Sequence, residues 1–151
     1  IGHQLNAIVK HPAVIAKHSK QRRNLRVDII DVSIGAGVLL SSIERYIHPP
    51  QTGDYVFWMA ADDYAELWLS TSEAPAKKSR IVSMSRWTPS RAWEKYPERA
   101  SKPIHLEVGR RYDIEALQME ATVDDCLAVG WRLPDGNLER PIPGTRLSTA
   151  N

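Results

Sequence analysis

The sequence has one cysteine, Cys126, among 151 residues. A single cysteine excludes an internal disulfide and a zinc site built from several thiolates. No apolar run approaches the roughly 20 residues that cross a bilayer, so no membrane span is predicted. Residues 1–4 lack a basic segment followed by an apolar one, so no signal peptide is predicted. The chain also lacks an initiator Met, which leads us to expect a processed chain or a fragment of a longer protein.

Acidic residues are absent before Asp28, although this stretch is rich in basic ones: Lys10, Lys17, Lys20, Arg22, Arg23 and Arg26. A basic arm of this kind can hold an anion or a nucleic acid, or it can be an ordinary solvated face. The formal charge of the whole chain is only +2, and no aromatic residues are interleaved with the basic ones at 10–26. Nucleic acid is therefore not predicted as a partner.

Signatures of catalysis are also missing. The sequence has no nucleophile elbow, no phosphate-binding glycine loop and no His-x-x-x-His spacing among its five histidines. The many carboxylates leave open a glycosidase pair, but nothing in the sequence distinguishes such an acid from a metal ligand. We do not predict an enzyme, and a screen for glycoside hydrolysis would test this.

Short alternating segments dominate the chain after about residue 37. Strands are predicted near 43–47, 55–59, 66–71, 81–84, 104–108, 111–120 and 126–133. Residues 134–137 read Pro-Asp-Gly-Asn, which predicts a turn because Pro fixes φ and Gly allows positive φ. Before the strands, residues 3–18 have helical spacing interrupted by Pro12, which predicts a short helix. The expected fold is an all-β antiparallel sandwich or barrel with a short N-terminal helix.

Residues 85–103 do not fit a hairpin. This stretch contains three prolines, two tryptophans and a tyrosine. Irregular segments of this length are uncommon in compact domains and are often functional.

Several ordered motifs resemble one known family. Residues 46–58 read YIHPPQTGDYVFW, residues 60–69 read AADDYAELWL, residues 106–116 read LEVGRRYDIEA, residues 127–131 read LAVGW and residues 142–144 read IPG. Together they resemble the anthrax protective-antigen type domain, the PA-14 domain. The resemblance is clear over 36–147 and weaker over 1–35, and it is nearest to a bacterial subgroup with an Arg-x-Trp loop, here residues 91–93. We therefore expect one domain over residues 1–151.

This resemblance implies a module of a larger secreted or cell-surface protein, and in lectin members a calcium ion held by two consecutive aspartates. Asp62 and Asp63 match that pair, and Asp124 and Asp125 are expected nearby. Calcium takes 6–8 oxygen ligands, which carboxylates, carbonyls and water can supply. One departure weakens the match, because Cys126 stands where related sequences have Asn, and a thiol is a poor calcium ligand. Consecutive aspartates are also common in exposed turns.

The irregular segment supplies candidate ligand-binding residues. Aromatic faces commonly pack against pyranose rings, while polar groups fix the orientation of the sugar. The candidates are Trp87, Arg91, Trp93, Lys95 and Tyr96. The alternative is that Trp87 and Trp93 only pin the segment to the barrel, and Trp58, Trp68 and Trp131 lie in strand patterns that indicate structural roles.

The predicted function is calcium-dependent binding of a glycan or polysaccharide by a non-catalytic module outside the cell, alongside other domains of its parent protein. The alternative is a structural spacer or capping module without its own ligand. The family barrel begins with a strand upstream of the region that residue 1 matches. If that strand is missing, an open sheet edge would favour a homodimer.

Overall fold

The computed structural model describes residues 31–32, 39–61, 64–85, 88, 92–120 and 127–149. The described strands are β1 (Asp31–Val32), β2 (Leu39–Ile47), β3 (Gly53–Ala61), β4 (Tyr64–Leu69), β5 (Ser79–Met84), β6 (Ile104–Leu106), β7 (Tyr112–Glu120), β8 (Leu127–Arg132), β9 (Leu138–Glu139) and β10 (Leu147–Thr149). Three short 3-10 helices lie among them: η2 (Pro75–Lys77), η3 (Pro97–Arg99) and η4 (Gly144–Arg146). The helix predicted within 3–18 lies outside the described residues.

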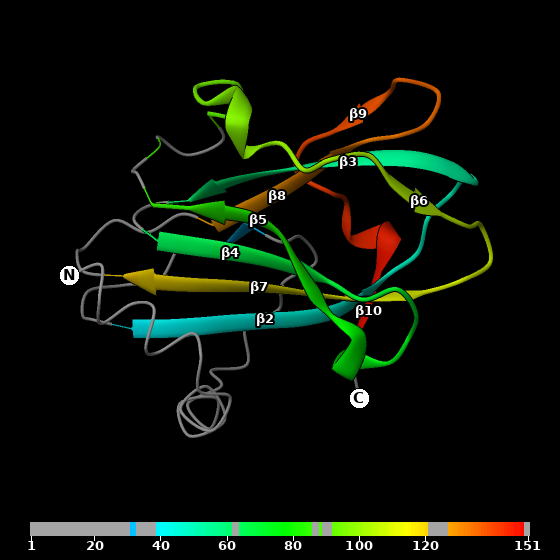
Figure 1. Cartoon of the computed structure of the whole chain (residues 1–151), viewed down its shortest axis with the longest axis horizontal. Coiled ribbons are helices and arrows are strands. Elements are labelled where there is room, and N and C mark those ends of the chain that lie inside the picture. The colour runs from blue at the N-terminus through cyan, green and yellow to red at the C-terminus, as the bar shows by residue number, and fades with distance from the viewer. Residues whose placement is uncertain are drawn as a thin grey trace.

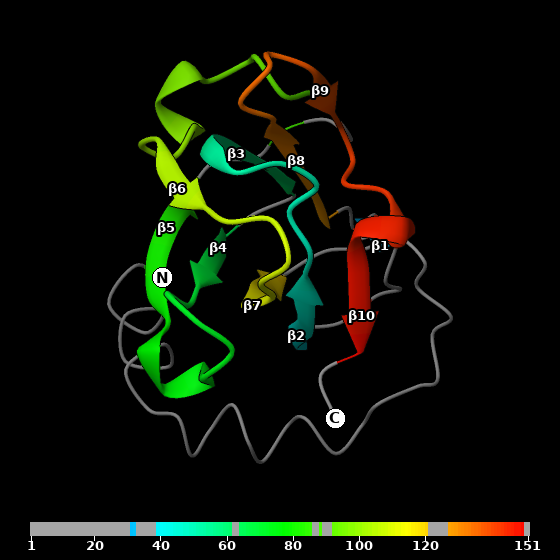
Figure 2. The ribbon, with the colours of Figure 1, turned by 90° about the vertical axis from the view of Figure 1, so that its right-hand side faces the viewer.

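The strands form two antiparallel sheets that pack face to face (Figures 1 and 2). The first sheet has the order β1-β8-β3-β6, with β9 also paired to β8, and we call it the upper sheet. The second has the order β10-β2-β7-β4-β5, and we call it the lower sheet. Figure 2 shows the two layers end-on. The buried core residues come from strands of both sheets. The prediction of an all-β antiparallel sandwich is confirmed.

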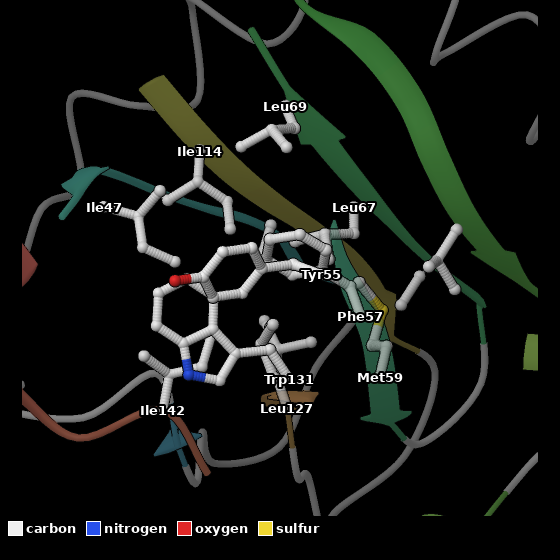
Figure 3. Close-up of a cluster of buried hydrophobic side chains, with 14 of the residues drawn as sticks. Ile47, Tyr55, Phe57, Met59, Leu67, Leu69, Ile114, Leu127, Trp131 and Ile142 are labelled. Carbon is white, nitrogen blue, oxygen red and sulfur yellow. The ribbon is translucent and has the colours of Figure 1, made fainter. Parts of the chain in front are cut away.

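Alternation along β3 explains which side chains form the core. Tyr55, Phe57 and Met59 are buried in the space between the sheets, as their period of two predicts. The Trp131 ring from β8 lies against them, with ring centroids 4.7 Å from Tyr55 and 5.8 Å from Phe57. Figure 3 shows these rings at the centre of the cluster, with Ile47 of the lower sheet beside them. Each tilted aromatic pair adds about 1 kcal/mol beyond the burial of apolar area.

The outer face of the lower sheet carries a cluster of charged side chains. The Lys78 ammonium lies 2.7 Å from Glu44, 2.7 Å from Glu115 and 3.0 Å from Asp113. Asp113 is fully buried, and this burial raises the pKa of its carboxyl although Lys78 acts in the opposite direction. Burial alone would lower the pKa of Lys78, but its hydrogen bonds to the three carboxylates outweigh burial and raise it. One cation thus holds three carboxylates from two neighbouring strands.

A second buried carboxylate, Glu66 of β4, lies on the same outer face. It accepts hydrogen bonds from the Tyr64 hydroxyl, from the Trp68 indole nitrogen at 2.9 Å and from Arg80 at 2.6 Å. Burial, reinforced by Glu66, raises the pKa of Tyr64 to about 12. Trp68 therefore has the structural role that its strand pattern predicted.

All seven predicted strands are present, within a few residues of their expected bounds. The predicted turn is also confirmed: Gly136 has φ of 91°, and the Leu133 amide donates to the Asn137 carbonyl at 2.8 Å. Sequence reasoning missed β1, β9 and β10, each two or three residues long. Such short strands carry too few alternating positions to be recognised by pattern.

Candidate functional site

Both acidic pairs follow or precede strands that meet at one end of the sandwich. β3 ends at Ala61, whose register partner is Leu127 at the start of β8. Tyr64 at the start of β4 pairs with Met119 near the end of β7. β3 and β7 therefore finish, and β4 begins, at the same end of the sandwich, on the left in Figure 1.

The four proposed metal ligands, Asp62, Asp63, Asp124 and Asp125, lie outside the described residues. Cys126, the departure from the family pattern, lies outside them too. Among the residues that the structure does describe, no group of three or more His, Cys, Asp or Glu side chains could hold a metal ion. The calcium site expected at the two acidic pairs remains a prediction.

Thr88 ties the irregular segment 85–103 to the strand end that precedes Asp62. It is 1% exposed, and its hydroxyl donates to the Ala61 carbonyl at 2.9 Å. The same hydroxyl accepts from the Ala61 amide at 3.2 Å, and the Thr88 amide donates to the Ala61 carbonyl at 3.2 Å. The irregular segment is therefore attached at Thr88 to the last residue of β3.

The far end of the same segment is fixed to the middle of β3. The Ser101 amide donates to the Phe57 carbonyl at 2.8 Å, and its hydroxyl accepts from the Phe57 amide at 2.9 Å. An isolated bridge pairs Ala100 with Trp58. Since β6 covers only Gly53–Tyr55, these contacts continue the cover of the same strand edge toward Ala61.

The candidate ligand residues of this segment divide into two groups. Trp87 and Arg91 lie outside the described residues. Trp93 and Tyr96 are half-buried, and Lys95 is exposed. The Arg99 guanidinium lies 4.0 Å from the centroid of the Tyr96 ring and Lys95 lies 5.6 Å from it. Tyr96, a ligand-binding candidate, thus already has cations packed on its ring, which favours a structural role for it.

A further cluster lies on the outer face of the upper sheet. Trp58 points away from the core because it alternates with Phe57 and Met59. The Arg140 guanidinium carbon lies 4.2 Å from the centroid of its ring, and that of Arg132 lies 6.0 Å away. Arg140 also contacts Glu94 of the irregular segment at 3.2 Å. Sequence reasoning assigned Trp58 a structural role, although alternation alone would have placed it on the outer face.

A glycine makes room for this cluster. Gly130 is the register partner of Trp58, and a Cβ placed on it would lie 2.7 Å from Arg140 Cγ. That separation is shorter than any ordinary contact between carbons. The backbone of β8 thus allows the Arg140 stem to cross the sheet closely and reach the indole.

A model of the PA14 domain matches residues 10–144 of this sequence. The chain belongs to the PA14 domain family. This match confirms the resemblance to the PA-14 domain that the motifs at 46–58, 60–69 and 106–116 indicated.

Two curated relatives are fibrocystins. This PA14 domain is 31% identical to the dog protein and 34% identical to the mouse protein over 105 residues, which is 65% of this chain. The match covers 3% of either fibrocystin, so this chain corresponds to a small part of those proteins.

Solved structures with the same fold include an anti-sigma factor domain-containing protein from Clostridium clariflavum. It has a TM-score of 0.57 and 20% identity, over 82% of this chain and 40% of that one. The A domain of epithelial adhesin 9 from Candida glabrata, solved with Galβ1-4GlcNAc, has a TM-score of 0.48 and 16% identity over 66% of this chain and 47% of that one. The fold assignment rests on the first of these. Within the described residues, no helix is long and apolar enough to cross a membrane.

Proposed function

We propose that this PA14 domain is a non-catalytic, calcium-assisted carbohydrate-binding module of a larger extracellular or cell-surface protein. Family membership supports the assignment to a class of modules that includes lectins. The observation that carries the proposal is the contact between Thr88 of the irregular segment and Ala61, the residue that directly precedes Asp62 in the sequence. Both acidic pairs also join strands that meet at this end.

In this proposal the acidic pairs bind the calcium ion, and the irregular segment contacts the sugar. Carboxylates of Asp62, Asp63, Asp124 and Asp125 would supply oxygen ligands, which calcium prefers. When bound, the ion would coordinate sugar hydroxyls. Trp93 and Lys95 of the irregular segment, with Trp87 and Arg91, would contact the ring and fix its orientation.

Thermal unfolding in excess calcium and in chelator tests the metal. Binding to the folded state alone adds about 2.7 kcal/mol at one hundred times Kd. We expect calcium to raise the unfolding temperature of the wild type but not of Asp62→Asn/Asp63→Asn. The matched control is Asp54→Asn/Glu107→Gln, which removes two exposed carboxylates elsewhere and should keep the calcium response. A glycan array read in calcium and in chelator then tests the sugar.

A structural spacer or capping module is the second candidate. The packing of Arg99 on Tyr96 favours it, because that ring face is then not open to a sugar. This candidate predicts no calcium response and no binding on the array. Light scattering would separately test the expected homodimer, which a monomeric mass would contradict.

A further inference from the structure

We propose that Arg140 and Arg132 on Trp58 form a second binding site, distinct from the acidic end, which accepts the carboxylate of an acidic sugar. The inference rests on the proposed carbohydrate-binding function, since it specifies a class of glycan. The three residues share the outer face of the upper sheet, with Trp58 on β3, Arg132 on β8 and Arg140 directly after β9.

The charges of this cluster are unbalanced. Two guanidinium groups lie at 4.2 Å and 6.0 Å from the centre of one indole ring. Among the described residues, the one ion pair that either arginine forms is that of Arg140 with Glu94 at 3.2 Å. Two cations against one carboxylate leave a local excess of positive charge, which attracts an anion.

The arginine at the centre, Arg140, is partly buried and incompletely hydrogen-bonded. The Arg140 side chain is 13% exposed. Its Nε is buried without a hydrogen-bond partner among the described residues. A buried polar donor without a partner carries a desolvation cost that a ligand acceptor relieves. A guanidinium is also well shaped to bind a carboxylate through two parallel hydrogen bonds.

The ion pair between Glu94 and Arg140 is weak. Its side chain is 82% exposed, and exposed ion pairs contribute little to stability. The carboxylate of a ligand could therefore displace the Glu94 carboxylate from Arg140. The indole of Trp58 is half-buried and carries Arg140 on its ring, so a sugar ring bound by the two arginines would contact only the part of the indole that they leave exposed.

Calorimetric titration with sodium glucuronate, glucose and sodium acetate tests the proposal on the whole chain in chelator. Glucose is the matched ligand without the carboxylate, and acetate is the carboxylate without the ring. We expect the chain to bind glucuronate more tightly than either. Arg132→Gln, at an exposed position, should weaken glucuronate binding several-fold, and Arg140→Gln should weaken it about tenfold. Glu94→Gln should strengthen it, because the internal competitor is removed.

Several outcomes would overturn the proposal. No glucuronate binding in chelator would do so, and so would binding that all three variants leave unchanged. Equal affinities for acetate and glucuronate would show that the site binds a carboxylate without recognising the sugar ring. Because these titrations contain no calcium, their failure leaves the calcium response of Asp62 and Asp63 untouched, and the two proposals can fail separately. Circular dichroism of Arg140→Gln, beside Arg132→Gln, shows whether a loss of binding is a loss of folding.

Discussion

The indole nitrogen of Trp131 donates a hydrogen bond of 2.6 Å to Glu139. Trp131 is fully buried between the sheets, so its N–H needs an acceptor there. Arg146 holds the same carboxylate through Nη2 at 2.9 Å and Nε at 3.2 Å. The short strand β9 is thus linked to the largest side chain of the core.

Replacement of Glu139 by Ala should destabilise the domain by about 2 kcal/mol, because the buried Trp131 N–H loses its acceptor. Glu139→Gln keeps an acceptor oxygen and should cost less. Urea unfolding monitored by circular dichroism measures both. Equal stabilities for the Ala and Gln variants would show that the hydrogen bond to Trp131 is not the important contribution of this carboxylate.

Asp113 should make stability depend on pH. Its pKa is raised in the folded state, so the folded protein binds more protons than the unfolded chain just above the ordinary value of 3.8. Stability contributed by this group therefore falls as pH rises through that window. Asp113→Asn should lack this slope, and its stability relative to the wild type should increase with pH above 3.8. Urea unfolding across the pH series measures the difference, and parallel curves for the two proteins would contradict it.

Lys78→Met should be strongly destabilising near neutral pH, by about 3 kcal/mol. It removes the cation that holds Glu44, Asp113 and Glu115 and leaves a buried carboxylate without its ion pair. Adding Asp113→Asn to this variant should recover part of the loss, because the amide carries no charge. Thermal unfolding of the single and double variants measures the recovery, and simple additivity of the two substitutions would refute the coupling.

Gly53→Ala should be more costly than Gly109→Ala, although both glycines have positive φ. A Cβ at Gly53 would lie 2.7 Å from two carbons of the Pro134 ring, whereas a Cβ at Gly109 would meet nothing within 4 Å. Backbone strain alone costs about 1 kcal/mol, so we expect about that for Gly109→Ala and at least about 2 kcal/mol for Gly53→Ala. The difference between the unfolding free energies of the two variants measures the cost of the contact between the new Cβ and Pro134.

The Tyr64 hydroxyl should ionise late. Burial and then Glu66 raise its pKa from 10.0 to about 12, so a titration of phenolate absorbance should show Tyr64 ionising above the ordinary range, as Tyr55, whose pKa burial also raises, should do. The difference between wild type and Tyr64→Phe isolates this group. Glu66→Gln should lower the pKa only in part, because burial is the larger cause. Full return to the ordinary value would show that Glu66, rather than burial, controls it.

The sequence was sufficient to predict the sandwich because its core residues alternate with a period of two. Tyr55, Phe57 and Met59 are all buried, as their alternation predicts. Family motifs predicted the PA14 domain, and the family comparison confirmed it. Period and motif are local properties of the chain, so both can be recognised from the order of residues alone.

Contacts between distant segments could not be predicted in this way. Arg140 reaches Trp58 across Gly130, and the three residues are separated in sequence but brought together by the β3–β8 register and the turn that leads to β9. The attachment of the irregular segment through Thr88 and Ser101 could not be predicted either, because the sequence does not distinguish a buried Ser or Thr from an exposed one. The proposed metal ligands Asp62, Asp63, Asp124 and Asp125 lie outside the described residues and stay a prediction.

The attachment of Thr88 to Ala61 and of Ser101 to Phe57 also affects how this domain behaves in a crowded solution. An uncovered strand edge can pair with a neighbouring molecule and seed aggregation. Here Thr88 and Ser101 of the irregular segment cover that edge of β3 through backbone groups and their two small hydroxyls. Substitutions at exposed positions between the two anchors, such as Lys95, can therefore change the surface of the segment while the edge of β3 stays shielded from neighbouring molecules.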